Sequence, residues 1–269
     1  MRLATGTSLF AWAALLGLAG ASAAVAAPTD DDVKKAEKAV KEHLDTLKGS
    51  AAKVEYVKDE AVQRVLPKAL VFAVRFPQYP VGRIPPKGLK AANVFTVDGD
   101  GKVKVITDRK ELLELFSALD AVKTDDAAKD AARAYVRLTQ ELHQDGYYQF
   151  ALMDDSTKVT TDKGARKASA KVVVMKGGNG EINATLAFDD KGKLSKIDED
   201  VKLKPGPRPI CQATKLLDAD PIVRRMAEQD LRCMGRAAKD YLDEQRAKAG
   251  PELRRAIDTL WQRICEEDR

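Results

Sequence analysis

The sequence predicts an α+β protein: two tandem units, each a helix followed by an antiparallel meander, and then a small all-α helical module. Two observations predict this arrangement. The stretch 97–106, VDGDGKVKVI, has an echo at 188–197, FDDKGKLSKI, and each copy has the pattern of a strand, a tight turn and a second strand. After the proline-rich segment 204–209, apolar residues recur only at helical spacing.

The N-terminus has the pattern of a secretory signal peptide over residues 1–26. Arg2 precedes a short apolar run, Leu9–Leu18, and Ala24-Val-Ala26 has the small-x-small form of a signal-peptidase site. We expect cleavage after Ala26, with Ala23 as the second choice; the alternative is an uncleaved membrane anchor. No later segment is apolar over enough residues to cross a bilayer, so the sequence predicts a secreted or periplasmic protein without a transmembrane segment after cleavage.

The first unit is expected over residues 28–120. Thr29 and the three aspartates after it are typical of a helix start, and Asp108 is placed to cap a second helix. Alternating apolar residues indicate strands between these helices. The expected strands are 53–57, 69–76, 93–97 and 102–106.

The second unit, expected over residues 121–203, begins as the first does, because Thr124-Asp-Asp126 matches Thr29-Asp-Asp31. The helix it starts is expected to end near Asp145-Gly146. Gly177–Gly180 is interpreted as a flexible hairpin turn. The expected strands are 147–153, 166–175, 181–188 and 193–201.

Residues 204–209, Lys-Pro-Gly-Pro-Arg-Pro, are predicted to be an exposed linker, because alternating prolines favour an extended chain. The helical module follows over residues 210–269. Asp220 is placed to cap a helix that has Pro221 in its first turn and ends at Gly235. Cys233 lies seven residues after Met226, so we expect both on one buried face of this helix.

The three cysteines, Cys211, Cys233 and Cys265, all lie in the helical module. In an oxidising compartment, this number is compatible with one disulfide and one free thiol, or with three buried thiols. Their wide spacing does not match a zinc site, and no other motif in the chain points to a metal or a cofactor.

The stretch Leu217–Gly235 resembles a HEAT-type helical repeat unit in its Asp-Pro start, its paired arginines and its final glycine. In this resemblance Tyr241-Leu242 opens the packing face of the second helix, and Glu252–Arg255 starts a third. It implies a single unit that packs on the sheets or on a partner, because a repeat array needs several units to bury its faces. The two preceding units resemble cystatin-like and PepSY-like domains in element order and in the Asp-x-x-Gly-Lys hairpin. That resemblance implies a role in binding or inhibition.

Two polar clusters contain residue types that could carry chemistry. His143-Gln-Asp145 offers a base and an orienting carboxylate for a hydrolase, but no serine or cysteine stands in a nucleophile turn, and Gly146 favours a helix C-cap there. Asp98-Gly-Asp100-Gly begins like a calcium loop, yet it lacks the further ligands of an EF-hand and is interpreted as a turn. The sequence therefore names no catalytic residue.

The segment Pro77–Lys90 is the candidate partner-binding loop, with Tyr79, Arg83 and Ile84 as its contact residues. Its prolines restrict the backbone, and a preorganised loop loses less entropy on binding. The alternative is a stiff connection without a binding role.

Charge argues against a nucleic-acid partner, because 46 basic and 41 acidic residues are interspersed and leave a net charge of only +5. The function predicted is that of an exported, non-catalytic binding or scaffold protein whose partner is another protein or an envelope component. The alternatives are an inhibitor or modulator of a secreted hydrolase, and a hydrolase that uses the His143 cluster.

Overall fold

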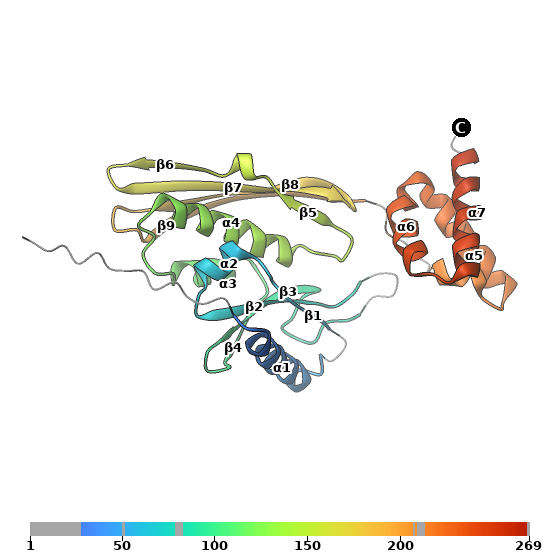
Figure 1. The fold of residues 1–269 in the computed structure, drawn as a ribbon, viewed down its shortest axis with the longest axis horizontal. Helices are drawn as coiled ribbons and strands as arrows, with labels where there is room; N and C mark the ends of the chain where they lie inside the picture. The colour runs from blue at the N-terminus through green and yellow to red at the C-terminus, as the bar shows by residue number, and fades with distance from the viewer. Residues whose placement is uncertain (1–27, 50–51, 79–82, 207, 209–212, 268–269) are drawn as a thin grey trace, which may run out of the picture.

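The computed structural model describes residues 28–49, 52–78, 83–206, 208 and 213–267. It confirms the predicted class: two helix-plus-meander units are followed by a helical module (Figure 1). The first unit runs α1(Asp30–Thr46), β1(Lys53–Tyr56), α2(Glu60–Val65), β2(Ala69–Arg75), β3(Ala92–Asp98), β4(Val103–Ile106) and α3(Arg109–Ser117). The second runs α4(Asp125–Leu142), β5(Gln149–Leu152), β6(Lys158–Asp162), β7(Ala165–Lys176), β8(Gly178–Phe188) and β9(Leu194–Pro205).

The predicted helix starts are confirmed by their capping hydrogen bonds. Thr29 and Asp32 form a reciprocal capping box at α1, and the Thr124 hydroxyl accepts from the amide of Ala127 at α4. Asp108 caps α3 in the same way, through the amide of Glu111. These bonds satisfy amides that a helix leaves unpaired in its first turn.

The two echoing hairpins have the same turn. In each, the aspartate side chain accepts from two later amides: Asp98 from Asp100 and Lys102, and Asp189 from Lys191 and Lys193. The glycine three positions after each aspartate has φ of 80°, a value that side chains with a Cβ disfavour. The aspartate, glycine and lysine that the two copies share therefore form the same turn at both places.

The two α+β units are built in four layers: α1, the first sheet, the helices α2, α3 and α4, and the second sheet (Figure 1). The first sheet has the order β1-β2-β3-β4, and the second has β5-β7-β8-β9 with β6 paired to β7. All the pairings are antiparallel. α1 covers one face of the first sheet through Ala36, Val40 and Leu44, which pack on Phe72 and Phe95.

Helix α4 joins the two units into one core, because it packs on both sheets. A single cluster of buried side chains contains Val71 and Val94 of the first sheet, Tyr135 of α4, and Ile182 and Leu186 of the second sheet. Phe116 of α3 meets Tyr135 edge-on with ring centroids 5.0 Å apart. The second unit thus supplies the helix that covers the inner face of the first sheet, a relation that the tandem pattern alone does not contain.

Two elements were not expected from the sequence. α2 is only six residues long, and Asp59 caps it through the amide of Val62. β6 is a short and mostly exposed edge strand, Lys158–Asp162, with threonines in place of an apolar alternation. Neither segment carries a long periodic pattern, which is the signal that sequence reasoning depends on.

The first two residues of the expected linker 204–209 belong to a strand, so the prediction of a linker was wrong at Lys204 and Pro205. β9 continues to Pro205, and Lys204 pairs with Asn179 of β8. Gly178 and Gly180, expected in a flexible turn, belong to β8, and a Cβ on Gly180 would lie 1.9 Å from the carbonyl oxygen of Lys202. Arg208 is nearly buried, with 6% of its side chain exposed. Residues 207 and 209 lie outside the described part of the chain.

The helical module contains α5(Pro221–Met234), α6(Lys239–Lys248) and α7(Pro251–Glu267), with short 3-10 turns at 213–217 and 235–238. Asp220 caps α5 and Gly235 ends it, as predicted. The expected burial of Cys233 was wrong: Met226 and Cys233 do share a face, but both are exposed, and α5 is buried through Ala227 and Leu231. Cys265 is half-buried and carries a free thiol, as Cys233 does, whereas Cys211 lies outside the described residues.

Candidate functional site

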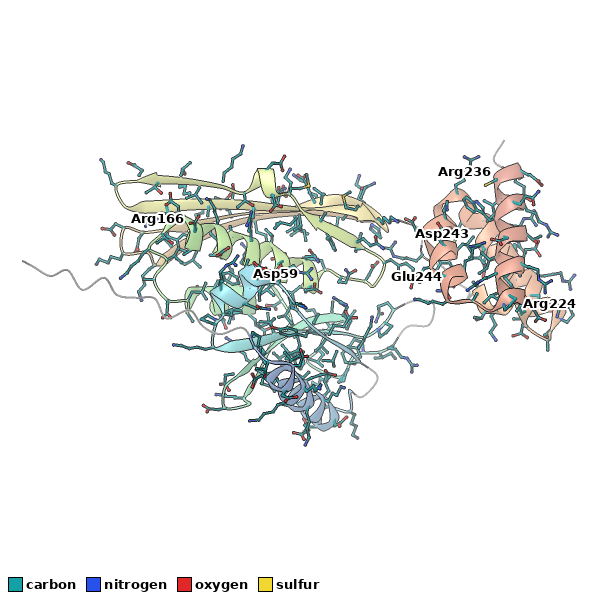
Figure 2. All side chains as sticks on the ribbon, viewed as in Figure 1. Asp59, Arg166, Arg224, Arg236, Asp243 and Glu244 are labelled. Carbon is teal, nitrogen blue, oxygen red and sulfur yellow. The ribbon has the colours of Figure 1, made fainter. Side chains whose placement is uncertain are left out.

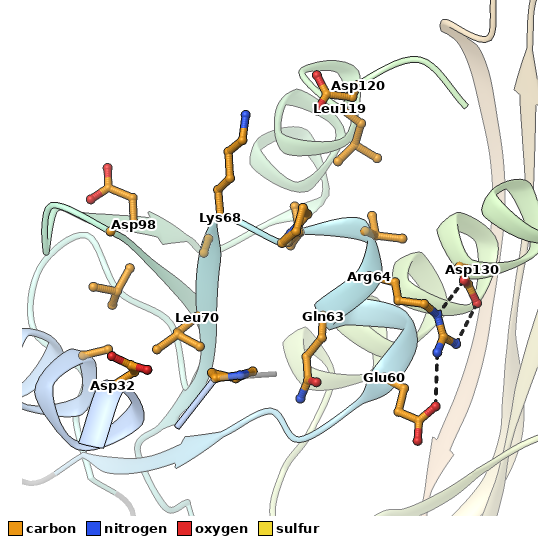
Figure 3. A pocket seen from close by; sticks show the side chains of 18 of the residues that line it. Asp32, Glu60, Gln63, Arg64, Lys68, Leu70, Asp98, Leu119, Asp120 and Asp130 are labelled. Carbon is orange, nitrogen blue, oxygen red and sulfur yellow. Dashed lines mark hydrogen bonds and ion pairs between the residues drawn. The ribbon is translucent and has the colours of Figure 1, made fainter. Parts of the chain in front are cut away.

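A groove of about 1310 Å³ opens between α1, α2 and the start of α4 (Figure 3). The β3–β4 hairpin turn and the segment between α3 and α4 complete its walls. Its apolar lining is contributed by Val65, Leu66, Leu70, Val97, Leu119 and Val122. Charged side chains line it as well, among them Lys35, Lys68, Asp98 and Asp120. An apolar surface with charged groups around it is typical of a binding site.

An ion pair holds the wall of the groove where the two units meet. Arg64 of α2 donates from Nε and Nη2 to the two carboxylate oxygens of Asp130 on α4, over 2.7 and 3.0 Å. It also reaches Glu60 over 3.1 Å (Figure 3). The hydrogen bond that Arg64 donates to Asp130 raises the pKa of Arg64 above its ordinary value. The groove is therefore held by contacts between residues that lie more than sixty positions apart.

A second hollow, of about 560 Å³, lies at the opposite end of α4. It brings together two segments that the sequence analysis had treated separately, because Pro77, Gln78 and Lys90 of the candidate loop face His143, Asp145 and Tyr147. We call this hollow the loop cleft.

A buried charge network lies beside the loop cleft. Arg75 of β2 is hydrogen-bonded to Glu55 of β1 and to Glu141 of α4, and Arg137 donates to Glu141 over 2.8 Å. Only 2% of the Glu141 side chain is exposed. Burial lowers the pKa of Arg75, but the Glu141 and Glu55 carboxylates outweigh it, so the pKa lies above its ordinary value. Arg75 therefore stays charged, and its role is to tie the first sheet to α4.

The carboxylate of Asp145 is engaged by groups other than His143. Its Oδ1 accepts from the amides of Tyr147 and Tyr148 over 2.9 and 3.2 Å, and its Oδ2 accepts from Arg208 over 2.7 Å. His143 occupies the C-cap of α4, as expected. A hydrolase would need Asp145 to orient the imidazole, so the geometry gives the hydrolase alternative no support.

We expect His143 to make a small pH-dependent contribution to stability. His143 lines the loop cleft and is partly exposed, and its partial burial lowers its pKa from the ordinary 6.5. The unfolded chain then binds the proton more readily, so stability falls as the pH drops below about 6.5. In His143→Gln the urea midpoint should fall less between pH 7 and pH 5 than in the wild type. An equal fall of the urea midpoint in the wild type and in His143→Gln would show that His143 does not cause the pH dependence.

The candidate partner loop is anchored at its base. The Gln78 side chain donates to the carbonyls of Phe76 and Arg83 over 2.8 and 3.0 Å, and the amide of Arg83 donates to Pro77 over 2.8 Å. The fully buried Asn93 holds the other end through both backbone groups of Lys90. Ile84 is 93% exposed and Arg83 is exposed, while Tyr79 lies outside the described residues.

No three histidine, cysteine, aspartate or glutamate side chains within the described ranges could together hold a metal ion. Asp98 instead closes its own turn, as described above. In the same part of the chain, no helix combines the length and the apolar character needed to cross a bilayer.

Comparison with family models, with curated proteins and with solved structures gives no match for this chain.

Proposed function

We propose that this protein is an exported, non-catalytic binding protein and that the groove between α1, α2 and α4 receives an apolar segment of another protein. The single observation that carries the proposal is the groove itself, with its apolar lining and its charged surround. Export is supported by the signal-peptide pattern at the N-terminus.

The shape and the chemistry of the groove favour a peptide segment over a compact polar ligand. Its lining comes from helices, a hairpin turn and a connecting segment spread over both units. Apolar contact with the lining would supply most of the affinity, since burial of apolar surface contributes roughly 25 cal/mol per Å². The lysines and aspartates around it, such as Lys35, Lys68 and Asp98, would set the orientation of the segment.

A second candidate function is modulation of a secreted hydrolase through the loop 77–90. The observation that favours it is Ile84, which is 93% exposed in a loop whose two ends are held by Gln78 and Asn93. A large exposed apolar side chain next to hydrogen-bonded anchors is suited to insertion into a cleft of a partner.

Capture of a partner by the mature protein tests both candidates. Ala121 is exposed and lines the groove, so Ala121→Trp should fill part of it without disturbing the core. We expect this variant to lose at least about tenfold in partner affinity, because an interface tolerates little overlap at a buried contact. The measurement is capture from an envelope extract with mass spectrometry, followed by titration of the captured protein.

Two further variants make the result specific. Ala118 is exposed, ends α3 and does not line the groove, so Ala118→Trp is the matched control and should bind as the wild type does. Ile84→Asp tests the loop. Binding that survives Ala121→Trp but not Ile84→Asp would place the binding site on the loop and not in the groove. A captured hydrolase would then favour the second candidate function. Equal binding by all the variants would contradict both.

A further inference from the structure

Helix α5 has a second apolar face that the helical module does not cover. Its inner face packs into the module through Ala227 and Leu231. On the outer face Ile222 is 57% exposed and Met226 is 59% exposed, and Cys233 is exposed beside them. Figure 2 shows the start of α5, marked by Arg224, at the end of the module that lies away from both sheets. The outer face is accessible to a second molecule, because Ile222, Met226 and Cys233 are exposed on it.

The residues of the outer face follow the spacing of a coiled-coil seam. Ile222, Met226, Gln229 and Cys233 are separated by four, three and four positions. This is the alternation of the d and a positions of a heptad, which places all four side chains along one line of the helix. A seam of this kind buries its side chains only against another helix.

Two charges flank the seam without a partner. Arg225 lies on one side and Asp230 on the other, and within the described residues neither makes an ion pair or a side-chain hydrogen bond. The remaining charged side chains of α5 are all engaged. They are Arg224 with the carbonyls of Asp218 and Ala219, Glu228 with Arg263, and Arg232 with Glu267.

The spacing of these two charges selects one kind of helix pair. Arg225 precedes Met226 and so takes the g position, and Asp230 follows five residues later at the e position. In a parallel pair of helices the g residue of one helix faces the e residue of the other, five positions on. Two copies of α5 would therefore form the pair Arg225–Asp230 twice. In an antiparallel pair g residues face g residues and e residues face e residues, so Arg225 would face Arg225 and Asp230 would face Asp230.

We propose that α5 is a homodimer interface, on which α5 of a second copy packs in parallel about a two-fold axis. The occupant is a second copy because the unpaired charges complement their own copies at the spacing that a parallel pair requires. The symmetry also places Cys233 next to Cys233 of the second copy and Gln229 next to Gln229. This inference does not depend on the proposed function, because the groove and α5 share no residue.

A charge-swap series on the mature chain tests the interface. Dimerisation is measured by sedimentation velocity over a range of concentrations at low salt. Arg225→Asp and Asp230→Arg should each weaken dimerisation by about tenfold, because two attractive pairs become repulsive. The double variant restores opposite charges and should return to wild-type dimerisation. Ile222→Asp should abolish the dimer, and circular dichroism melting confirms that each variant is folded.

Crosslinking tests the parallel orientation separately. A short bismaleimide should join two chains of the wild type through Cys233, and Cys233→Ser should lose that product. Several results would overturn the proposal: a monomeric wild type, a dimer that Arg225→Asp leaves intact, or a double variant that folds but stays monomeric. A dimer without the Cys233-dependent crosslink would exclude the parallel arrangement.

Discussion

Arg208→Ala should lower the free energy of unfolding by about 3 kcal/mol, since removing one partner of a buried ion pair leaves the other charge uncompensated. The guanidinium donates to Asp145 and, over 2.5 Å, to the carbonyl of Gly177. Its central carbon also lies 5.1 and 5.0 Å from the ring centres of Tyr147 and Tyr148, a cation–π geometry that adds to the loss. Burial raises the pKa of Tyr147 to about 12, so this ring faces the arginine as a neutral phenol.

The same substitution should loosen the connection between the sheets and the helical module. Tyr147 packs against the core of the module, and its ring centre lies 6.5 Å from that of Tyr241 on α6. Without Arg208, trypsin should cut earlier at Lys204, which the wild type protects by its pairing in β9. Urea denaturation and timed trypsin digestion measure the two effects.

Two controls separate the contacts of Arg208 from its charge. Arg208→Lys keeps the charge but not the fork of donors, so it should recover only part of the stability. Arg255→Ala removes an exposed arginine of α7 and should change stability by less than about 0.5 kcal/mol. An Arg208→Ala protein as stable as the Arg255→Ala protein would show that these contacts carry no net stability.

Glu141→Ala should cost about 3–5 kcal/mol, because it leaves Arg75 and Arg137 without their shared buried carboxylate. Arg75 belongs to β2 and Glu141 to α4, so the lost interaction lies between the two units. The two units share one buried cluster. We therefore expect one cooperative transition that moves as a whole to lower urea concentration. It is followed by far-UV circular dichroism and by the near-UV circular dichroism of tyrosines, among which Tyr56 and Tyr135 lie in the two units.

Glu114→Ala is the matched control, since Glu114 is exposed on α3 and has no partner in the described part of the chain. It should change stability by less than about 0.5 kcal/mol. Glu141→Gln keeps the shape but places an amide against two guanidinium groups, so it should remain clearly destabilised. Two separate transitions in Glu141→Ala, with only one of them shifted, would show that the units fold independently.

The candidate sites were only partly predictable from the sequence. The loop 77–90 was recognised by its prolines, and its role in binding stays a prediction; of its expected contact residues, Arg83 and Ile84 are exposed. The groove was missed, because its walls come from α1, α2, a hairpin turn and α4. Arg64 and Asp130 could not be paired in advance, since nothing in the sequence places α2 against α4.

Local chemistry determined the parts of the fold that depend on a few neighbouring residues. The caps Thr29, Asp108 and Thr124 and the paired turns at Asp98 and Asp189 follow from side-chain hydrogen bonds within four residues. The apolar periodicity likewise determined most of the helices and strands.

Tertiary packing decided which faces are buried and which units belong together. A seven-residue spacing places Met226 and Cys233 on one face of α5, but that face lies outward because Ala227 and Leu231 fill the module core. Helix α4 carries apolar side chains around much of its surface, and only the folded chain shows that it serves both sheets. Lys204 and Arg208 were expected in an exposed linker. Instead, Lys204 pairs with a residue of β8, and Arg208 packs on the rings of Tyr147 and Tyr148. Periodicity defines a face relative to its own helix or strand, whereas burial depends on contacts between residues far apart in the chain.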